Sequence, residues 1–339
     1  MKILIDGRVL THKIYTGVEN YTLNILKNIK TDLEVKILKP KTNNKYLSHF
    51  WTHFILPFKK GDIMFCPANI SPIFIPKNKK VIVTIHDVIF LTHPKSFSKF
   101  FRIYYKIIMP YIIRRADKII TVSNYSKLDI EKYYPNSKGK IEVIYNGFEN
   151  KFMKIDNIEK KNQILYVGSI NERKNFIGVI KSFELLKQKD LKLLIIGNFL
   201  SNFEIDEDSK KIILDAKNNP NIIFKNNVKN YELIKIYNES KLFLFPSFYE
   251  GFGLPVLEAM ACGTPVVCSN TTSLPEVGSD AVIYCNPTDI EDIKNKIELV
   301  LGNKQLQNKL IQKGLKRVKK FSWEESARKH LKIFKEYEK

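Results

Sequence analysis

The sequence has few cysteines and no arrangement of them that would build a metal centre or a disulfide framework. The four cysteines are Cys66, Cys262, Cys268 and Cys285, and none belongs to a C-x-x-C pair or lies near a run of histidines. Disulfide frameworks are typical of small secreted domains, whereas this chain has 339 residues. We therefore expect the cysteines to be small buried apolar side chains in a reducing compartment.

Long apolar runs are also absent from the sequence. A helix that spans a bilayer takes about 18 or more consecutive apolar residues, and no such run occurs. The apolar stretch at residues 1–5 is short and is interrupted by Asp6, so it is unlike a secretory signal. The sequence therefore predicts a cytoplasmic protein, or one that is peripheral on the cytoplasmic face of a membrane.

Acidic residues are too few to balance the basic ones. The chain has 56 Lys and Arg against 35 Asp and Glu, a formal net charge of +21, of which the first 150 residues carry +14. A surplus of this size indicates an anionic partner, such as nucleic acid, lipid headgroups or a phosphorylated ligand, and favours the N-terminal half as the side that meets it. The alternative is compositional drift, because Lys also accumulates in Ile- and Asn-rich sequences without a partner.

Apolar residues make up 44% of the chain, which excludes a disordered or fibrous protein. Short Ile-, Val- and Leu-rich runs alternate with longer amphipathic stretches, as in parallel strands that helices cover on both faces. The expected strands are 2–10, 33–38, 62–66, 81–85, 118–122 and 141–144, then 164–167, 191–196, 222–224, 242–245, 265–268 and 281–284. The expected helices are 18–29, 96–115, 124–134, 175–187, 231–240, 255–262 and 289–301.

A polar stretch without a clear period separates the two series of strands. The sequence therefore predicts an α/β protein with two doubly wound, Rossmann-like domains. We place the first domain at residues 1–150, a linker at 151–162 and the second domain at 163–321. A last helix within 322–339 is expected to pack back on the first domain. Ligands of such sheets bind beyond the carboxyl ends of the strands, so the expected site is a cleft between the domains.

The most informative stretch, FPSFYEGFGLPVLEAMACGTP, spans residues 245–265. Glu250 lies in a glycine-containing loop after an expected strand, and Glu258 lies about one turn into the helix that follows. Glycines at a helix start let backbone N–H groups approach a phosphate. A phosphate repels a carboxylate, so the two carboxylates are expected to bind sugar or ribose hydroxyls. Taken alone, the stretch also fits an ordinary loop whose carboxylate complements the helix dipole.

This stretch resembles the Glu-x7-Glu signature of family 4, group 1 glycosyltransferases, with Glu250 and Glu258 as its two glutamates. The match continues through residues 273–278, and residues 166–175 (YVGSINERKN) resemble the donor-diphosphate loop of the family. The resemblance covers essentially the whole chain and is to bacterial polysaccharide mannosyl- and hexosyltransferases. It implies a GT-B fold, in which 1–150 is the acceptor side and 163–321 binds the nucleotide sugar.

The resemblance implies an anomer-retaining hexosyltransferase of surface polysaccharide biosynthesis. Its donor would be a GDP- or UDP-linked hexose, and its acceptor a glycan or a lipid-linked glycan. Glu250 would hold donor-sugar hydroxyls and Glu258 the ribose, while Arg173 and Lys174 would neutralise the diphosphate and help it leave. The remaining donor-binding candidates are Gly17, Gly168, Val228, Gly251, Phe252, Gly253 and Leu254.

On the acceptor side, the candidates are His86, Asp87 and Asn146. Related enzymes have a His near the reacting sugar at the place of His86, which makes it a candidate for polarising donor or acceptor. A lone His at a strand end is otherwise more often a satisfied structural group. Asn146 and the following glycine are similar to the hinge-side pair of the family. Gly17 belongs to residues 15–21 (YTGVENY), which are similar to the N-terminal glycine loop of the family.

Two positions depart from the pattern of the family. Ser169 stands where many relatives have an Arg, so Arg173 is expected to do more of the work. Residues 225–228 (KNNV) replace a glycine near the nucleotide base, which leaves the choice of base open. No Asp-x-Asp motif ends a strand, because Asp206–Asp208 lies in a polar stretch. We therefore expect neither a metal ion nor another cofactor, the nucleotide sugar being a substrate.

The segment Phe97–Arg115 is apolar almost all round and carries five basic residues. Such a helix either lies in an anionic membrane interface or forms part of the core of the first domain, with its last arginines favoured by the helix dipole. Two other classes of function also remain open. One is a retaining glycoside hydrolase that uses the Glu250 and Glu258 carboxyl groups, which would have to lie about 5 Å apart. The other is a basic nucleic-acid-binding protein, although the aromatic residues follow strand and helix patterns and so indicate no specific nucleic-acid site.

Overall fold

The computed structural model describes residues 1–12, 17–197 and 207–338 and divides them into two compact units. Tyr15 and Thr16 of the first glycine motif, and Asp206, lie outside the described residues. The first unit comprises Met1–Thr92, Lys99–Gly147 and Phe321–Lys339, and the second comprises His93–Ser98 and Phe148–Lys320.

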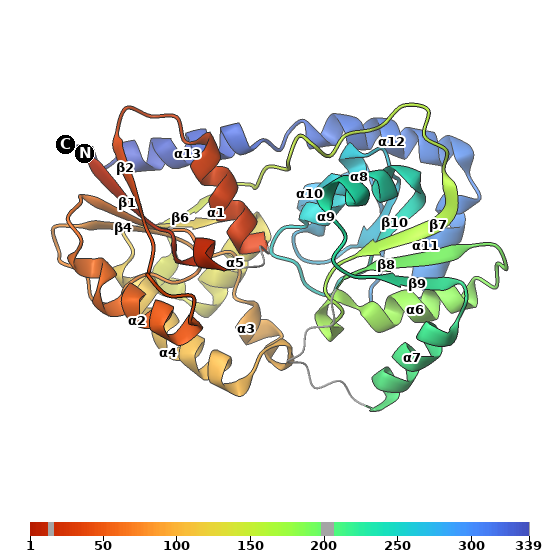
Figure 1. The fold of residues 1–339 in the computed structure, drawn as a ribbon, viewed down its shortest axis with the longest axis horizontal. Coiled ribbons are helices and arrows are strands. Elements are labelled where there is room, and N and C mark those ends of the chain that lie inside the picture. The colour runs from red at the N-terminus through yellow and green to blue at the C-terminus, as the bar shows by residue number, and fades with distance from the viewer. Residues whose placement is uncertain (13–16, 198–206, 339) are drawn as a thin grey trace. The chain divides into compact units, whose positions relative to one another are not determined.

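The first unit is built on a sheet of six parallel strands with helices on both faces (Figure 1). Its strands are β1 (Lys2–Asp6), β2 (Glu34–Leu38), β3 (Ile63–Cys66), β4 (Lys80–Thr84), β5 (Lys118–Thr121) and β6 (Ile141–Val143), in the order β2-β1-β3-β4-β5-β6. Its α-helices are α1 (Gly17–Asn28), α2 (Lys45–Phe54), α3 (Ile89–Thr92), α4 (Lys99–Arg115), α5 (Asn124–Tyr133) and α13 (Trp323–Lys335). Helices α1 and α13 cover one face, and α2 and α4 cover the other (Figure 1).

The second unit repeats this architecture with the strand order β12-β11-β10-β7-β8-β9. Its strands are β7 (Lys161–Val167), β8 (Lys192–Ile196), β9 (Ile222–Lys225), β10 (Ser240–Phe245), β11 (Val266–Ser269) and β12 (Ile283–Cys285). Its α-helices are α6 (Phe176–Leu185), α7 (Glu207–Asn218), α8 (Asn230–Glu239), α9 (Leu254–Ala261), α10 (Leu274–Gly278), α11 (Ile290–Leu301) and α12 (Lys304–Val318). Buried Ile, Val, Leu and Phe fill the central strands, as sheets covered on both faces require. The expected fold class, with two Rossmann-like domains, is confirmed.

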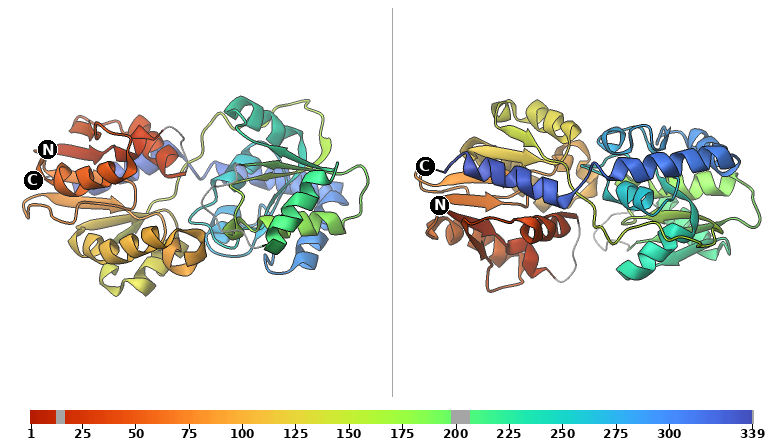
Figure 2. Two further views of the ribbon diagram at one scale, coloured as in Figure 1. Left: turned by 60° about the horizontal axis from the view of Figure 1, so that its bottom comes forward. Right: turned by 90° about the horizontal axis from the view of Figure 1, so that it is seen from above.

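The last helix, α13, packs on the first unit (Figure 2). The Tyr21 hydroxyl of α1 lies 2.7 Å from Nε2 of His330 on α13 and 2.9 Å from the Thr84 hydroxyl at the end of β4. Nδ1 of His330 donates a hydrogen bond to the Ser326 carbonyl at 2.7 Å, so Nε2 accepts a hydrogen bond from the Tyr21 hydroxyl. The ring of Phe334 also lies 5.2 Å from that of Phe65 on β3.

The segment expected to be a linker is packed against the second unit. Phe152 is buried and its ring lies 6.0 Å from that of Tyr237 on α8. The Asn238 side chain accepts from the backbone N–H of Ile155 at 2.7 Å and donates to the Met153 carbonyl at 3.0 Å. The polar composition of this stretch predicts a linker, and two of its backbone groups are bonded by the side chain of one asparagine of α8. The division between the units falls at Gly147 and Phe148.

Gly147 is a position where the structure leaves no space for a side chain. A Cβ there would overlap the backbone of Ser322 and Trp323, where α13 begins, whereas a Cβ on Gly17 would meet nothing within 4 Å. We expect Gly147→Ala to lower the free energy of unfolding by about 1–3 kcal/mol, the usual cost of overpacking. Gly17→Ala, the matched control, should leave it unchanged or slightly higher. Urea denaturation of both variants measures the difference, and equal stabilities would contradict the packing.

Candidate functional site

The donor-side candidates lie at the carboxyl ends of two neighbouring strands, β7 and β10. Strands β8 and β9 separate β7 from β10 in the sequence, yet β7 and β10 pair in parallel. The strand order of the sheet reverses between these two strands. Ligands of open α/β sheets bind at such a reversal point. Residues 168–175 follow β7 and residues 246–253 follow β10, so the two glycine-containing loops lie side by side.

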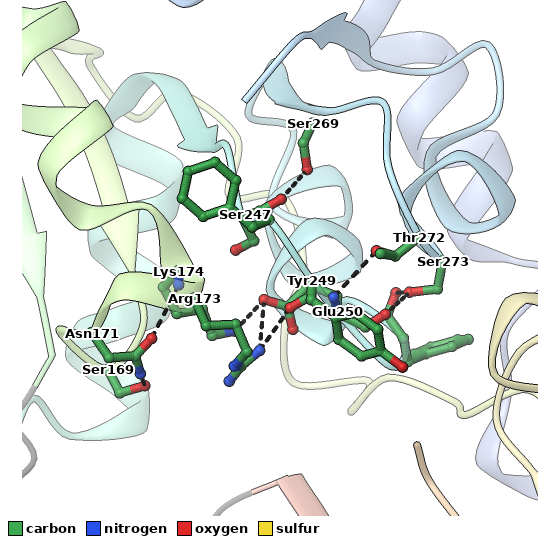
Figure 3. A network of polar contacts seen from close by, with 12 residues as sticks. Ser169, Asn171, Arg173, Lys174, Ser247, Tyr249, Glu250, Ser269, Thr272 and Ser273 are labelled. Carbon is green, nitrogen blue, oxygen red and sulfur yellow. Dashed lines mark hydrogen bonds and ion pairs between the residues drawn. The ribbon is translucent and has the colours of Figure 1, made fainter. Parts of the chain in front are cut away.

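A buried ion pair joins the two loops. Nζ of Lys174 lies 2.5 Å from Oε1 of Glu250 (Figure 3). The same atom lies 4.7 Å from the centre of the Phe245 ring. Arg173 brings its guanidinium to 3.4 Å from the same carboxylate oxygen and donates to the Tyr249 carbonyl at 2.8 Å. The backbone also joins the loops, because the N–H of Phe248 donates to the Arg173 carbonyl at 2.9 Å. One carboxylate therefore faces two cations in a site with little water.

Burial and neighbouring charges shift the pKa values of both Glu250 and Lys174. Burial favours the neutral form of Glu250, but the neighbouring Lys174 and Arg173 outweigh it and hold the pKa of this carboxyl below its usual value. Burial lowers the pKa of Lys174 to about 8 against the opposing attraction of Glu250. Both partners are therefore ionised at neutral pH, and a carboxylate in that state only accepts hydrogen bonds.

The loop that carries Glu250 is held from the next strand along the sheet. The Thr272 hydroxyl accepts from the backbone N–H of Glu250 at 3.2 Å, and the Ser273 hydroxyl lies 2.8 Å from the carbonyls of Glu250 and Phe252 (Figure 3). Thr272 has φ of 57°, a conformation that is strained for a β-branched residue. Gly253 has φ of 115°, and a Cβ there would also press on Leu274. The conformation of this loop is thus fixed by groups on both sides of it.

Two backbone segments come close at the other side of the ion pair. Gly168 directly follows β7 and donates its N–H to the Ile196 carbonyl at 2.9 Å. Gly197 directly follows β8, and a Cβ there would overlap the carbonyl of Gly168, so this position requires a glycine. Asn171 orders the loop that follows, because its side chain accepts from the backbone N–H of Lys174 at 3.0 Å and donates to the Ser169 hydroxyl at 2.8 Å.

Glu258 occupies a different environment from Glu250. It lies on α9, and its carboxylate accepts from the Tyr237 hydroxyl of α8 at 3.1 Å. Burial raises the pKa of Glu258 to about 7 against the hydrogen bond from Tyr237, with smaller opposing effects of Glu149, which raises it, and Lys151, which lowers it. The charges that act on Glu250 come instead from Arg173 and Lys174. The two carboxyl groups therefore have separate partners, and at neutral pH Glu258 exchanges a proton with its surroundings.

The remaining donor-side candidates lie before α9, at its start, and between β9 and α8. Gly251 is partly exposed and Phe252 is buried in the loop before α9, while Leu254 is the first residue of that helix. Val228 lies between β9 and α8 and is partly exposed. The second-unit candidates therefore lie in the loops that follow β7, β9 and β10 and on α9.

In the first unit, His86 lies in the loop after β4 and is buried against Tyr21. The two rings meet edge to face with centres 4.7 Å apart. Nε2 of His86 lies 2.9 Å from the Pro67 carbonyl, so it carries the proton and donates it there. Burial lowers the pKa of His86 to about 4, so the ring is neutral and its Nδ1 is a hydrogen-bond acceptor.

The other first-unit candidates have different surroundings. The Asp87 carboxylate accepts from the backbone N–H of Ile89 at 3.2 Å, at the start of α3. Asn146 is buried, and its side-chain oxygen has no hydrogen-bond partner among the described residues. Gly17 is the first residue of α1. Among the acceptor-side candidates, His86 thus has its side chain oriented by two contacts, with the Tyr21 ring and the Pro67 carbonyl.

Several residues of the site escaped the sequence analysis. Thr272 acts through a strained backbone that no residue pattern predicts, and Tyr237 reaches Glu258 across the fold. The role of Asn171 could have been predicted from the sequence, because an Asn before a short turn often caps the backbone that follows. Asn175 is a second example: with φ of 52°, it caps α6 at the backbone N–H of Gly178 and donates to the Pro287 carbonyl.

Three general features of the described residues bear on the chemistry. All four cysteines are buried as free thiols. No group of three or more His, Cys, Asp or Glu in the described part of the chain is arranged to hold a metal ion. None of the helices in residues 1–12, 17–197 and 207–338 combines the length and apolar character needed to cross a membrane.

Two family comparisons cover most of this fold. A sequence model described as "Glycosyl transferases group 1" matches residues 148–317, half of the chain. A second, described as "Glycosyltransferase Family 4", matches residues 62–151. The two matches together include Glu250, Glu258 and the loop after β7, and also His86.

Whole-chain comparisons agree with the family matches. The O-antigen chain mannosyltransferase B of Escherichia coli is 29% identical over 99% of this chain and 100% of the relative. The O-antigen chain mannosyltransferase RfbU of Salmonella typhimurium is 29% identical over 75% of this chain and 69% of the relative. The structure of HepE from Anabaena in complex with UDP and glucose matches with a TM-score of 0.76 at 14% identity, over 99% of this chain and 100% of that one. The fold is thus the GT-B fold, as expected.

Breaking the buried ion pair should destabilise the second unit. Lys174→Met removes one charge and leaves Glu250 buried with Arg173 alone, so we expect a loss of about 3 kcal/mol in the free energy of unfolding. The matched control is Lys161→Met, which breaks a 2.7 Å pair with Glu239 in which the lysine is 59% exposed. That variant should cost less than about 1 kcal/mol.

A second substitution separates lost charge compensation from lost packing. Adding Glu250→Leu to Lys174→Met removes the stranded carboxylate, so part of the stability should return. Chemical denaturation of Lys174→Met, Lys161→Met and the double variant Lys174→Met/Glu250→Leu measures these free energies of unfolding. If Lys174→Met costs no more than Lys161→Met, the pair does not compensate a buried charge.

The pKa of Glu258 predicts a pH dependence of stability. Its folded value of about 7 lies above the ordinary 4.5, so between these values the folded protein keeps a proton that the unfolded chain has released. The free energy of unfolding should therefore fall as pH rises through this window, by up to about 3 kcal/mol, and level off above it.

Glu258→Gln tests this assignment because it removes the titrating proton but keeps a polar side chain of the same size. The slope between pH 5 and 7 should flatten, as measured by denaturation at fixed pH values. Glu232→Gln, at the partly exposed start of α8, is the control and should keep the wild-type slope. An unchanged slope in Glu258→Gln would show that another group titrates.

Proposed function

Because the chain belongs to the group 1 glycosyl transferases, we propose that it moves a hexose from a nucleotide-diphosphate sugar to a glycan acceptor, with retention of the anomeric configuration. Such a reaction needs cations where the diphosphate departs and hydrogen-bond acceptors where the sugar hydroxyls lie. Both are present at the carboxyl ends of β7 and β10.

The observation that carries the proposal is the ion pair of Glu250 with Lys174, with Arg173 beside it. The two cations lie in the loop that follows β7 and suit the negative charge that develops on a departing diphosphate. Glu250 is ionised and accepts hydrogen bonds only, which suits hydroxyl groups of the donor sugar. The loops hold these groups through hydrogen bonds and the ion pair itself, which would keep them in position for the reaction.

Glu258 is proposed to bind the ribose of the nucleotide. It lies on α9, whose first turn begins at Leu254 beside the glycine loop. Ribose hydroxyls can both donate and accept, so a carboxyl group that titrates near neutral pH can hold them in either of its protonation states. Gly251, Gly253 and Phe252 then provide the backbone wall before the helix, and Val228 is proposed to lie near the base.

His86 is proposed to receive a hydroxyl group of the sugar or of the acceptor. Its Nε2 proton is already given to the Pro67 carbonyl, which leaves Nδ1 as the acceptor. A neutral ring with a pKa of about 4 cannot donate a second proton at pH 7. This refines the expected role, because the ring would polarise a hydroxyl group by accepting a hydrogen bond from it rather than by donating one. Asp87 and Asn146 are proposed to lie on the acceptor side.

Names of relatives narrow the substrate classes. Two relatives are O-antigen chain mannosyltransferases, which favours mannose as the transferred hexose and a surface polysaccharide as the product. The solved HepE complex contains UDP and glucose, which keeps UDP as an alternative nucleotide to GDP. The acceptor is proposed to be a glycan or a lipid-linked glycan on the cytoplasmic face of the membrane. We propose that the reaction needs no metal, because Lys174 and Arg173 supply the positive charge.

Hydrolysis by the two glutamates fits the site less well. A retaining hydrolase needs one protonated and one ionised carboxyl group about 5 Å apart on the same sugar. Here Glu250 is compensated by two cations, and Glu258 has separate partners on α8. A hydrolase also has no use for Lys174 and Arg173. Binding of nucleic acid finds no array of exposed aromatic side chains at this site.

The donor is tested by thermal unfolding with a panel of UDP-, GDP-, ADP- and dTDP-sugars. One nucleotide class should raise the midpoint, because a ligand at 100 times its Kd stabilises by about 2.7 kcal/mol. Arg173→Met should abolish most of this shift, and Glu258→Gln should weaken it. Lys161→Met is the control, because Lys161 begins β7 and so lies at the end of the strands away from the candidate site. This variant should keep the full shift.

Product analysis tests the chemistry separately. Incubation with donor and acceptor should release the nucleoside diphosphate, and NMR of the new linkage should show the donor's anomeric configuration. An inverted linkage would overturn the retaining step alone. If no nucleotide sugar shifts the midpoint, or if Arg173→Met leaves the shift intact, the assignment of the donor site is wrong.

A further inference from the structure

Helix α4 has two apolar faces, of which only one is used by the fold. Its inner stripe consists of Tyr105, Ile108, Met109, Ile112 and Ile113, all buried. A second stripe, at positions three, seven and eleven residues after Phe100, faces outward and consists of Phe100, Ile103, Ile107 and Tyr111. These outer side chains are between 55% and 67% exposed. The helix is therefore a core helix on one side and carries an unused apolar stripe on the other.

Helix α2 and the turn after it continue the apolar surface. Tyr46, Phe50, Phe54 and Phe58 recur every four residues and are between 55% and 75% exposed, and Leu47 lies beside them. The rings of Phe50 and Phe54 stack on each other with centres 4.8 Å apart. Isolated exposed apolar residues need no explanation, but a periodic series of aromatic ones on one helix marks an interaction surface.

The two helices lie side by side, so their stripes form one surface. The ring of Tyr46 on α2 lies 6.1 Å from that of Phe100 on α4. Beneath it, the Tyr104 hydroxyl bonds to His49 at 3.0 Å and to His53 at 2.8 Å. Both helices cover the same face of the sheet (Figure 1). The outer residues are called the α2–α4 face: Tyr46, Leu47, Phe50, Phe54, Phe58, Phe100, Ile103, Ile107 and Tyr111.

The two chain segments that form this face carry only positive charges. No Asp or Glu occurs in residues 35–61, which contain α2, or in residues 88–116, which contain α4, and each segment has six Lys and Arg. Lys59 and Lys60 are exposed after α2, and Lys99, Lys106 and Arg114 are exposed along α4. The two segments thus account for most of the positive surplus of the first 150 residues.

We propose that the α2–α4 face binds an anionic lipid bilayer, with its aromatic and aliphatic side chains in the headgroup region and the lysines and arginines on lipid phosphates. Amphipathic helices that lie in a membrane interface combine an apolar face with flanking basic residues in this way. Helix α4 is too short and too basic to cross the bilayer, so it lies along the surface and keeps its inner stripe on the sheet.

Charge complementarity favours a bilayer over the other occupants of such a surface. A second copy of this chain would bring the same basic segments together, which repel one another. A single-stranded nucleic acid would use the charges and stack its bases on the aromatic rings, but it would leave Leu47, Ile103 and Ile107 in water. A bilayer with acidic lipids satisfies both components at once. The inference goes beyond sugar transfer and is tested without it, so its failure would leave the proposed function untouched.

Vesicle sedimentation tests the proposal on the full chain. The wild-type protein should bind vesicles of phosphatidylcholine with phosphatidylglycerol at least about tenfold more strongly than vesicles of phosphatidylcholine alone, and added salt should weaken this binding. The variant Phe50→Ser/Phe54→Ser/Ile107→Ser should lose about tenfold on anionic vesicles. The variant Lys59→Gln/Lys60→Gln should lose binding in proportion to the charge removed.

Exposed residues of the second unit provide matched controls. Leu214→Ser/Tyr231→Ser removes apolar side chains that are 60% and 71% exposed, and Lys304→Gln/Lys309→Gln removes two exposed lysines of α12. Both controls should bind as the wild type does. Circular dichroism and thermal midpoints verify that each of these vesicle-binding variants and their controls is folded, which is expected because the side chains that they replace are exposed.

The two tryptophans report which part of the chain meets the lipid. Trp51 lies on α2 and is partly exposed, whereas Trp323 at the start of α13 is buried. Lipids with brominated acyl chains should quench the emission of the Trp323→Phe variant, in which Trp51 remains, and leave that of Trp51→Phe unchanged.

Four results would overturn the proposal. These are no binding of the wild type to anionic vesicles, equal binding by the apolar variant and its control, and no quenching of Trp51. The fourth is sedimentation of the wild type as a dimer that the apolar variant dissociates, without vesicle binding, which would assign the face to a second copy of the chain.

Discussion

The buried ion pair of Lys174 with Glu250 is the interaction on which the second unit's functional loops depend. A carboxylate cannot stay ionised away from water without a partner, and Lys174 is that partner. The pair ties the loop after β7 to the loop after β10, two segments 76 residues apart in the chain. Because the partners come from neighbouring strands, the pair also fixes where both loops stand relative to the sheet.

The same constraint explains why the surroundings of Glu250 are unusual. Its loop contains a glycine with positive φ and is held by Thr272, a β-branched residue in the left-handed region. Such conformations persist only where neighbouring contacts determine them, and here hydrogen bonds from residues 272 and 273 do so. The strain places a compensated carboxylate, two cations and open glycine backbone at one edge of the sheet. That combination suits a ligand with hydroxyl groups next to a diphosphate.

Sequence patterning predicts the strands that carry this site, but not how they are ordered. Continuous apolar runs give β7 and β10 to within a few residues, and the motif places Glu250 and Lys174 after them. That these strands are neighbours follows from the crossover between β9 and β10, which no local pattern contains. Helices α2, α7 and α12, and the short helices α3 and α10, were not expected. The buried side chains of α2 are Ser48, Thr52 and His53, whereas most of its aromatic side chains are exposed, so its apolar period points away from the core. Helices α7 and α12 are strongly polar.

The first unit shows the same limit at longer range. His86 is predicted from its position at a strand end, but its orientation comes from the ring of Tyr21 and the Pro67 carbonyl. Tyr21 in turn bonds to His330, 309 positions away on the last helix. The sequence predicts that this helix returns to the first domain, yet gives no sign that it carries a buried histidine beneath the candidate site. The placement of His86 therefore depends on the end of the chain, and α13 takes part in the site through Tyr21.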